Sequence, residues 1–187
     1  MFVLNEVVFY PNVMNPIILL MLSYFTILIS CKSSLKETPA QSIAHFIVHT
    51  YLSAHDLKMI KRCERKFSYE AIDLNNDGDL EYFIRFFTAY FCGSGGCNIL
   101  ILNSKFQLIT DFSNTSPLIY VDSNTTNGWR NLFMWSNRSY FKIIYNKTIG
   151  SYCANSPTKH VENLSLRIKQ RSHEMFKDES YKKVYAF

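Results

Sequence analysis

The run LEYFIRFFTAYFCGSGGCNILIL, residues 80–102, decides the fold. Residues 80–91 alternate as a strand does, but both of the alternating sets are largely apolar. The sets are Tyr82, Ile84 and Phe86 on one face, and Phe83, Phe87 and Phe91 on the other. A strand that is apolar on both faces is buried on both faces. The run therefore predicts a central strand of a covered sheet, followed by a hairpin whose tip is the glycine-rich segment 93–96.

Outward from this run, short apolar stretches alternate with turn residues over most of the chain. The predicted strands are residues 67–72, 80–91, 98–102, 106–111, 118–121, 129–135, 140–145 and 148–153. Short polar links such as 103–105 and 136–138 are typical of tight hairpins. We expect an α+β fold, mainly an antiparallel β meander or sandwich with one N-terminal helix packed on it. After Ser156 the pattern allows a helix or a strand, and it favours a strand slightly.

The one clear helix begins at Thr38. Thr38 is a suitable N-cap, Pro39 occupies the first helical position, and Gln41 can complete a capping box. His45 and His49 are four residues apart, a spacing that can hold a metal ion. The segment between them lacks the glutamate of a zinc-protease helix, and no third ligand is nearby, so surface or packed histidines are the better interpretation.

The strongest chemical signal is the segment 73–81, DLNNDGDLE. Oxygen-bearing side chains at its first, third and fifth positions, with glycine at the sixth, match the front half of a calcium-binding loop. The candidate ligands are Asp73, Asn75, Asp77, Asp79 and Glu81. The twelfth position is Ile84 where an EF-hand needs glutamate, and the flanks are predicted strands. The acid at the ninth position, Glu81, instead resembles the hairpin calcium loops of integrin-type β-repeat proteins, and a calcium ion there would act as a structural clamp. The alternative is a turn in which the same side chains bind the loop's own backbone amides.

The N-terminal region has the features of a targeting sequence. Residues 16–30 form an uncharged apolar run of signal-peptide length, and Leu28-Ile29-Ser30-Cys31 resembles the lipobox of bacterial lipoproteins. That resemblance implies cleavage before Cys31 and lipidation of its sulfur. It divides the chain into a lipoprotein signal peptide (1–30), a tether (31–37) and a single globular domain (38–187). An ordinary secretory signal and a retained anchor over 7–29 remain as alternatives, although prolines interrupt the latter.

Lipidation of Cys31 would leave an even number of cysteines, as expected for an oxidising compartment. Cys92 and Cys97 bracket the hairpin tip and can face each other across its two strands. Cys63 and Cys153 are paired by elimination only. Free thiols are the alternative if the chain is cytoplasmic.

The net charge of the chain is +5, with a local basic cluster listed as Lys58, Lys61, Arg62, Arg65 and Lys66. The simpler interpretation is that the basic cluster is a solvated face. The more specific interpretation is that it attracts anionic envelope polymers. Export makes a nucleic-acid partner implausible.

The loop 73–78, Glu81-Tyr82, the long apolar strand and the run from Cys92 to Leu100 together resemble small uncharacterised bacterial envelope lipoproteins. The resemblance implies export and a compact domain, and it carries no activity. Lys32 after the lipidated cysteine resembles outer-membrane sorting, with the domain facing the periplasm.

No recognisable catalytic motif is present: there is no Gly-x-Ser-x-Gly elbow, and the glycines at 93–96 lack the lysine of a P-loop. We expect a lipid-anchored envelope protein with a non-catalytic binding role, such as an inhibitor or immunity protein, whose partner is an envelope protein or polymer. The alternatives are a hydrolase of envelope polymer that uses acids of the 73–81 loop, and a structural component of an envelope assembly.

Overall fold

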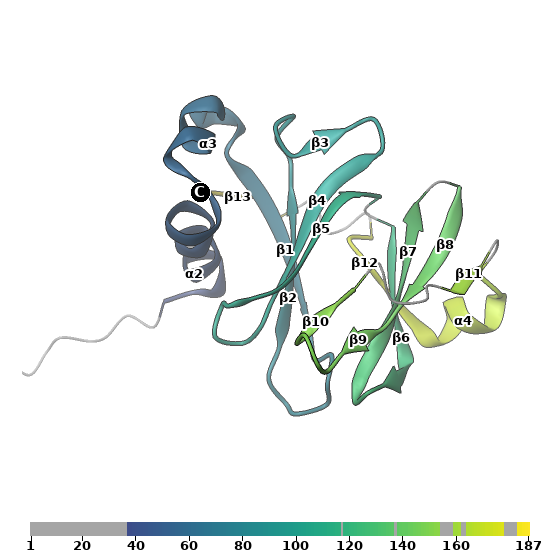
Figure 1. The fold of residues 1–187 in the computed structure, drawn as a ribbon. Coiled ribbons are helices and arrows are strands. Elements are labelled where there is room, and N and C mark those ends of the chain that lie inside the picture. The colour runs from purple at the N-terminus through teal and green to yellow at the C-terminus, as the bar shows by residue number, and fades with distance from the viewer. Residues whose placement is uncertain (1–36, 117, 137, 154–158, 162–163, 178–182) are drawn as a thin grey trace, which may run out of the picture. The chain divides into compact units, whose positions relative to one another are not determined.

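The structure is a computed structural model, and it describes residues 37–116, 118–136, 138–153, 159–161, 164–177 and 183–187 (Figure 1). Residues 37–187 form one compact unit. The predicted signal peptide, most of the tether and Cys31 lie outside the described residues.

Most of the helical elements precede the sheets in the chain. Helix α2 (Pro39–Phe46) begins at Thr38 with the predicted capping box and continues into a π-helical segment, η1 (Ile47–Tyr51). Helix α3 (Ala54–Met59) is capped by Ser53, and a short 3-10 helix, η2 (Arg62–Glu64), leads into the first strand. Figure 1 shows α2 and α3 together on one side of the first sheet.

The first sheet contains the run that decides the fold. Its strands are β1 (Lys66–Ile72), β2 (Glu81–Phe86), β3 (Cys92–Gly93), β4 (Gly96–Leu102), β5 (Leu108–Thr115) and β13 (Tyr185–Ala186). The order is β13-β1-β2-β4-β3, and β5 pairs with β4. Strand β2 is central and covered on both faces, as predicted, but it ends at Phe86 rather than Phe91. The chain turns there, since the Phe91 amide donates to the Thr88 carbonyl oxygen.

The second sheet contains β6 (Ile119–Thr126), β7 (Trp129–Ser136), β8 (Ser139–Ile143), β11 (Lys159–Val161) and β12 (Ser172–Met175), in the order β11-β8-β7-β6-β12. A small hairpin of β9 (Tyr145–Asn146) and β10 (Ser151–Tyr152) lies beside it. The slight preference for a strand after Ser156 was wrong in part, because α4 (Leu166–Arg171) precedes β12. Ser165 caps this helix, and its side chain accepts a hydrogen bond from the Ile168 amide.

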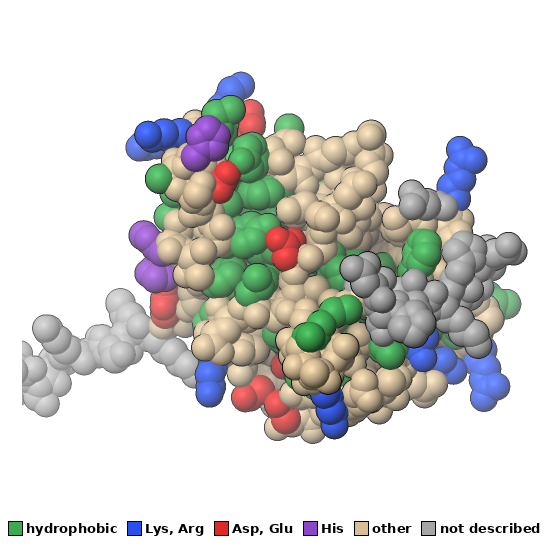
Figure 2. Space-filling view, viewed as in Figure 1, with side chains coloured by type: hydrophobic (Ala, Val, Ile, Leu, Met, Phe, Trp, Pro, Cys, Tyr) green, Lys and Arg blue, Asp and Glu red, His purple; other side chains and the backbone are tan. Residues whose placement is uncertain are grey.

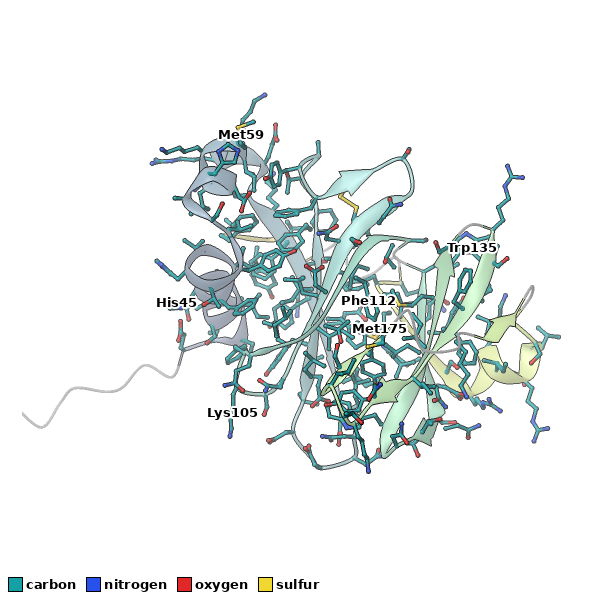
Figure 3. The ribbon with its side chains drawn as sticks, viewed as in Figure 1. His45, Met59, Lys105, Phe112, Trp135 and Met175 are labelled. Carbon is teal, nitrogen blue, oxygen red and sulfur yellow. A yellow bond between two sulfur atoms is a disulfide. The ribbon has the colours of Figure 1, made fainter. Side chains whose placement is uncertain are left out.

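Three clusters of buried side chains hold these layers together. One lies between the sheets and includes Phe83, Phe112, Leu132 and Met175. Figure 3 shows Phe112 and Met175 directed into this space. A second joins the helices to the other face of the first sheet, and the third packs α4 on the second sheet. The described domain is therefore an α+β fold of antiparallel sheets with a helical segment on one side, as the sequence predicts.

Candidate functional site

Three aromatic side chains from two separate segments meet at the surface of the domain. Tyr51 at the end of η1 and Tyr90 and Phe91 after β2 form what we call the aromatic surface; Tyr90 is 44% exposed and the other two are half-buried. Figure 2 shows hydrophobic side chains gathered between the helices and the neighbouring strands. The rings are in contact. The centroid of Phe91 is 5.1 Å from that of Tyr90 and 6.0 Å from that of Tyr51.

Hydrogen bonds hold both tyrosines in place. The Tyr51 hydroxyl donates to Oδ2 of Asp111 at 2.9 Å and accepts from Nδ2 of Asn98 at 3.4 Å. The Tyr90 hydroxyl donates to Oδ1 of Asp56 on α3. This bond is the main reason that the pKa of Asp56 is lowered to about 2. Because each tyrosine is tied to a different element, the surface is organised before any partner arrives.

The disulfide-closed hairpin adjoins this surface. Cys92 and Cys97 form the predicted disulfide, with Cα atoms 3.9 Å apart. The next residue, Asn98, donates its amide to the Phe91 carbonyl oxygen at 2.8 Å and its side chain to Tyr51. The hairpin also packs against β5, since a Cβ on Gly96 would lie 2.4 Å from the Thr115 carbonyl carbon. The cross-link therefore restrains a segment that positions the aromatic rings.

The chemistry of this surface suits binding. Burial raises the pKa of Tyr51 above its ordinary value, so its hydroxyl stays protonated and acts as a hydrogen-bond donor. Aromatic side chains have only two rotatable χ angles, so they give a large contact area at low entropic cost. They are enriched where proteins bind one another.

The predicted calcium loop adopts the self-capped turn that the sequence left as an alternative. Oδ1 of Asp73 accepts hydrogen bonds from the Asn75 and Asn76 amides, and its Oδ2 accepts from the Gly78 amide. In the same way, Asn75 accepts from the Asp77 amide and Asp77 from the Asp79 amide. Carboxylate and amide oxygens such as these are the type of ligand that calcium prefers. Among the described residues, however, no three His, Cys, Asp or Glu side chains are gathered for metal binding.

The last two acids of the predicted loop, Asp79 and Glu81, make other contacts. Oδ2 of Asp79 accepts a hydrogen bond from the Ser104 hydroxyl at 3.0 Å. Glu81 is buried, 2% exposed, and its Oε2 accepts from the Leu74 amide at 2.7 Å. Burial, with the nearby charges of Asp77 and Asp73, raises the pKa of Glu81 to about 7. Glu81 therefore anchors the loop to the core.

The remaining predicted positions are separate from this loop. The predicted Cys63–Cys153 disulfide is not formed: Cys63 is an exposed free thiol in η2 and Cys153 a half-buried one after β10. The sequence paired these two cysteines only because they were the ones left over. The fold places them in different parts of the domain, in η2 and after β10. His45 and His49 are exposed, with ring centroids 4.4 Å apart.

The basic cluster lies along α3, η2 and the start of β1, where four of its members are exposed. Arg65 is the exception, because its guanidinium donates to the carbonyl oxygens of Leu57 and Ile60 at the end of α3. One cation of the cluster, Lys61, pairs with Glu64 at 3.7 Å. The cluster is largely a solvated face with one structural arginine.

Sequence reasoning missed Tyr90 and the two aspartates that fix the tyrosines. Tyr90 had been assigned to a buried strand, and Asp56 and Asp111 are far from it in sequence. Thr88 offered the one local signal, since its hydroxyl accepts from the Tyr90 amide and ends the strand pattern.

No protein-family model, curated protein or solved structure matches this chain. Within the part of the chain that the structure describes, no helix has the length and apolar character needed to cross a membrane.

Proposed function

We propose that this chain is a lipid-anchored protein of the bacterial envelope with a non-catalytic binding role, and that the aromatic surface is where it contacts its partner. The observation that carries the proposal is the pair of tyrosines held by Asp56 and Asp111 next to a disulfide-closed hairpin. A preorganised aromatic surface lowers the entropic cost of binding. The apolar run and lipobox-like residues before Cys31 support the anchor.

The binding role is tested in living cells by placing a photo-crosslinking amino acid at position 90. Membranes are then solubilised in detergent, and cross-linked products are identified by mass spectrometry. We expect one dominant partner at position 90, and loss of that partner's co-purification in a Tyr90→Ala variant. Leu166, 77% exposed on α4, is the control position. Equal cross-linking from both positions would count against the aromatic surface as the contact.

The anchor is tested separately by metabolic labelling with palmitate. Wild-type protein should take up the label and a Cys31→Ser variant should not. Equal labelling of the two would exclude lipidation at Cys31, while leaving the binding role to be judged by the cross-linking result.

Within this class, an inhibitor or immunity protein that blocks a hostile enzyme is the specific function that we favour. A structural component of an envelope assembly would give cross-links to an abundant envelope protein instead. An envelope-polymer hydrolase is the competing class. It would be supported by turnover that disappears in an Asp77→Ala variant which still folds.

We also propose a structural calcium ion at the loop of Asp73, Asn75, Asp77, Asp79 and Glu81. The oxygen donors and the sharp turn at Gly78, whose φ is +90°, support it. Binding would stabilise the fold, so millimolar calcium should raise the melting temperature of wild-type protein and leave an Asp77→Ala variant unchanged. A specific calcium site would be excluded if calcium raised the melting temperature of both proteins equally and magnesium had the same effect as calcium.

A further inference from the structure

The positive charge of the helical side of the domain is concentrated in one short segment. Residues 53–66, which include α3, η2 and the start of β1, carry five basic side chains and only two acidic ones. Figure 2 shows Lys and Arg side chains projecting at the α3 end of the domain. This segment contains the whole basic cluster, so it attracts anionic groups at the surface.

Both acids of the segment already have partners. Asp56 accepts hydrogen bonds from the Tyr90 hydroxyl and the Ser53 amide, and Glu64 pairs with Lys61. The other exposed cations, which are Lys58, Arg62 and Lys66, form no ion pair within the part of the chain that the structure describes. Three cations are therefore free to bind an anion.

An exposed apolar side chain lies among these cations. Met59, the last residue of α3, is 59% exposed and lies between Lys58 and Lys61 in the sequence. Figure 3 shows Met59 directed away from the sheets. A surface that joins apolar and basic side chains suits the interface of a membrane, where the cations stay among the headgroups and the apolar group reaches the acyl boundary.

The length of the tether limits how far this surface can be from a membrane. Residues 32–37 join the proposed lipid-bearing Cys31 to Thr38, the N-cap of α2, and even a fully extended chain would span at most about 25 Å. A domain of the size of residues 37–187 is roughly 40 Å across. Helices α2 and α3 lie on the same side of the first sheet (Figure 1). The anchor would therefore hold the basic cluster within about one domain width of the lipid headgroups.

We propose that the helical side of the domain docks on the membrane, with the basic cluster bound to anionic phospholipid headgroups and Met59 at the interface. This inference rests on the proposed lipid anchor and adds a second contact with the same membrane. Each Lys or Arg near an anionic bilayer strengthens binding about fivefold. Because the tether makes docking intramolecular, a few cations are enough. Docking also fixes the orientation in which the aromatic surface meets a partner.

Cys63 provides a probe inside the cluster, because it is an exposed free thiol. The full lipidated chain, in a Cys153→Ser background, is labelled at Cys63 with a maleimide fluorophore and inserted into nanodiscs. The discs contain phosphatidylcholine, alone or mixed with phosphatidylglycerol, and a lipid with a spin-labelled headgroup that quenches the fluorophore on contact. We expect strong quenching with phosphatidylglycerol and weak quenching without it. Raising the ionic strength from about 0.1 to 1 M should abolish the difference, because salt screens the charges.

Two double variants with the same change in net charge test the position of the site. The substitutions Lys58→Gln and Arg62→Gln should together lower the ratio of docked to free domain by about tenfold or more. The matched control, Arg167→Gln with Lys169→Gln, removes two exposed cations from α4 and should dock like wild type. Tyr90→Ala should also dock normally, which separates this contact from the aromatic surface.

Amide hydrogen exchange gives a second measurement that needs no fluorophore. In unlabelled wild-type protein, residues 57–63 should exchange more slowly in discs with phosphatidylglycerol than in discs of phosphatidylcholine alone. A soluble anionic polysaccharide that slows the same amides, when phosphatidylglycerol does not, would overturn the proposal and assign the cluster to an envelope polymer.

Palmitate labelling of the same preparation distinguishes failure of docking from failure of the anchor. If the chain takes up palmitate but Cys63 is quenched equally in both kinds of disc, or in neither, docking is overturned and the anchor stands. Equal loss of quenching in the two double variants would trace the effect to net charge and would also overturn docking at this cluster. A chain that takes up no palmitate would refute the anchor, and docking with it, while the aromatic surface would still be judged by cross-linking.

Discussion

At the scale of single residues, Glu81 couples the candidate calcium loop to the core. Its carboxyl group is buried, binds the Leu74 amide and has a pKa raised from 4.5 to about 7, first by burial and then by Asp77 and Asp73. Protonation therefore favours the folded state, whereas ionisation places an anion among anions. A cation at the loop would reverse this preference, because it would stabilise the ionised form.

The pH dependence of stability follows from this pKa. Between pH 4.5 and 7 the folded protein holds the Glu81 proton more tightly than the unfolded chain, so the free energy of unfolding falls as the pH rises. We expect a loss of roughly 3 kcal/mol across this window, complete above about pH 7. A Glu81→Gln variant should lack the slope. Urea unfolding at a series of pH values measures it, and identical slopes in the two proteins would refute this role for Glu81.

Gly96 is the residue on which the packing of the hairpin depends. Its φ is +137°, and an added Cβ would lie 2.4 Å from the Thr115 carbonyl carbon and oxygen. Gly96→Ala should therefore cost about 2 kcal/mol or more. Gly93 at the same tip has nothing within 4 Å of an added Cβ, so Gly93→Ala is the matched control and should cost less than about 1 kcal/mol. Thermal melts compare the two, and equal losses would contradict the close contact with β5.

At the scale of elements, local sequence signals predicted some segments well. The capping box of Thr38 and Gln41 is a contact between residues three apart, and it forms as expected. The end of β2 was misplaced because Phe87 and Phe91 continue the apolar pattern, although the backbone turns at Thr88. The pairing of Tyr51 with Asp111 joins residues 60 apart, and no local pattern encodes such a contact.

The end of α4 depends on a similar long-range contact, an ion pair with β6. Nε and Nη2 of Arg171 donate to the two carboxylate oxygens of Asp122, at 2.7 and 3.0 Å, and the Asp122 side chain is 2% exposed. Arg171→Ala should cost about 3 kcal/mol, because it leaves a buried carboxylate without its partner.

The same pair predicts how the loss can be reversed. A further Asp122→Asn change should recover part of the stability in the alanine background while destabilising wild type. A double-mutant cycle from urea unfolding gives the coupling energy. Additive effects of the two changes would show that the bidentate contact adds nothing to stability.

At the scale of the whole molecule, the buried cluster between the sheets joins the two sheets and the β9–β10 hairpin to one another. Residues from both sheets and from the β9–β10 hairpin contribute to it. Tyr152 of that hairpin donates its hydroxyl to the Arg130 carbonyl oxygen of β7, and its amide donates to the Thr110 hydroxyl of β5. Residues 37–187 are accordingly expected to unfold as one cooperative unit, with neither sheet persisting alone.

Leu132 tests this cooperativity, because it is fully buried on β7 within the cluster. Leu132→Ala should cost about 2–5 kcal/mol, and it should lower the urea midpoint without changing the slope of the transition. Tryptophan fluorescence reports on β7 through Trp129 and Trp135, whereas far-ultraviolet circular dichroism reports on both sheets and the helices. The two probes should give coincident curves in wild type and variant alike. If fluorescence changed at lower urea than the dichroism, the second sheet would be unfolding by itself, and the cluster would join two independently stable parts.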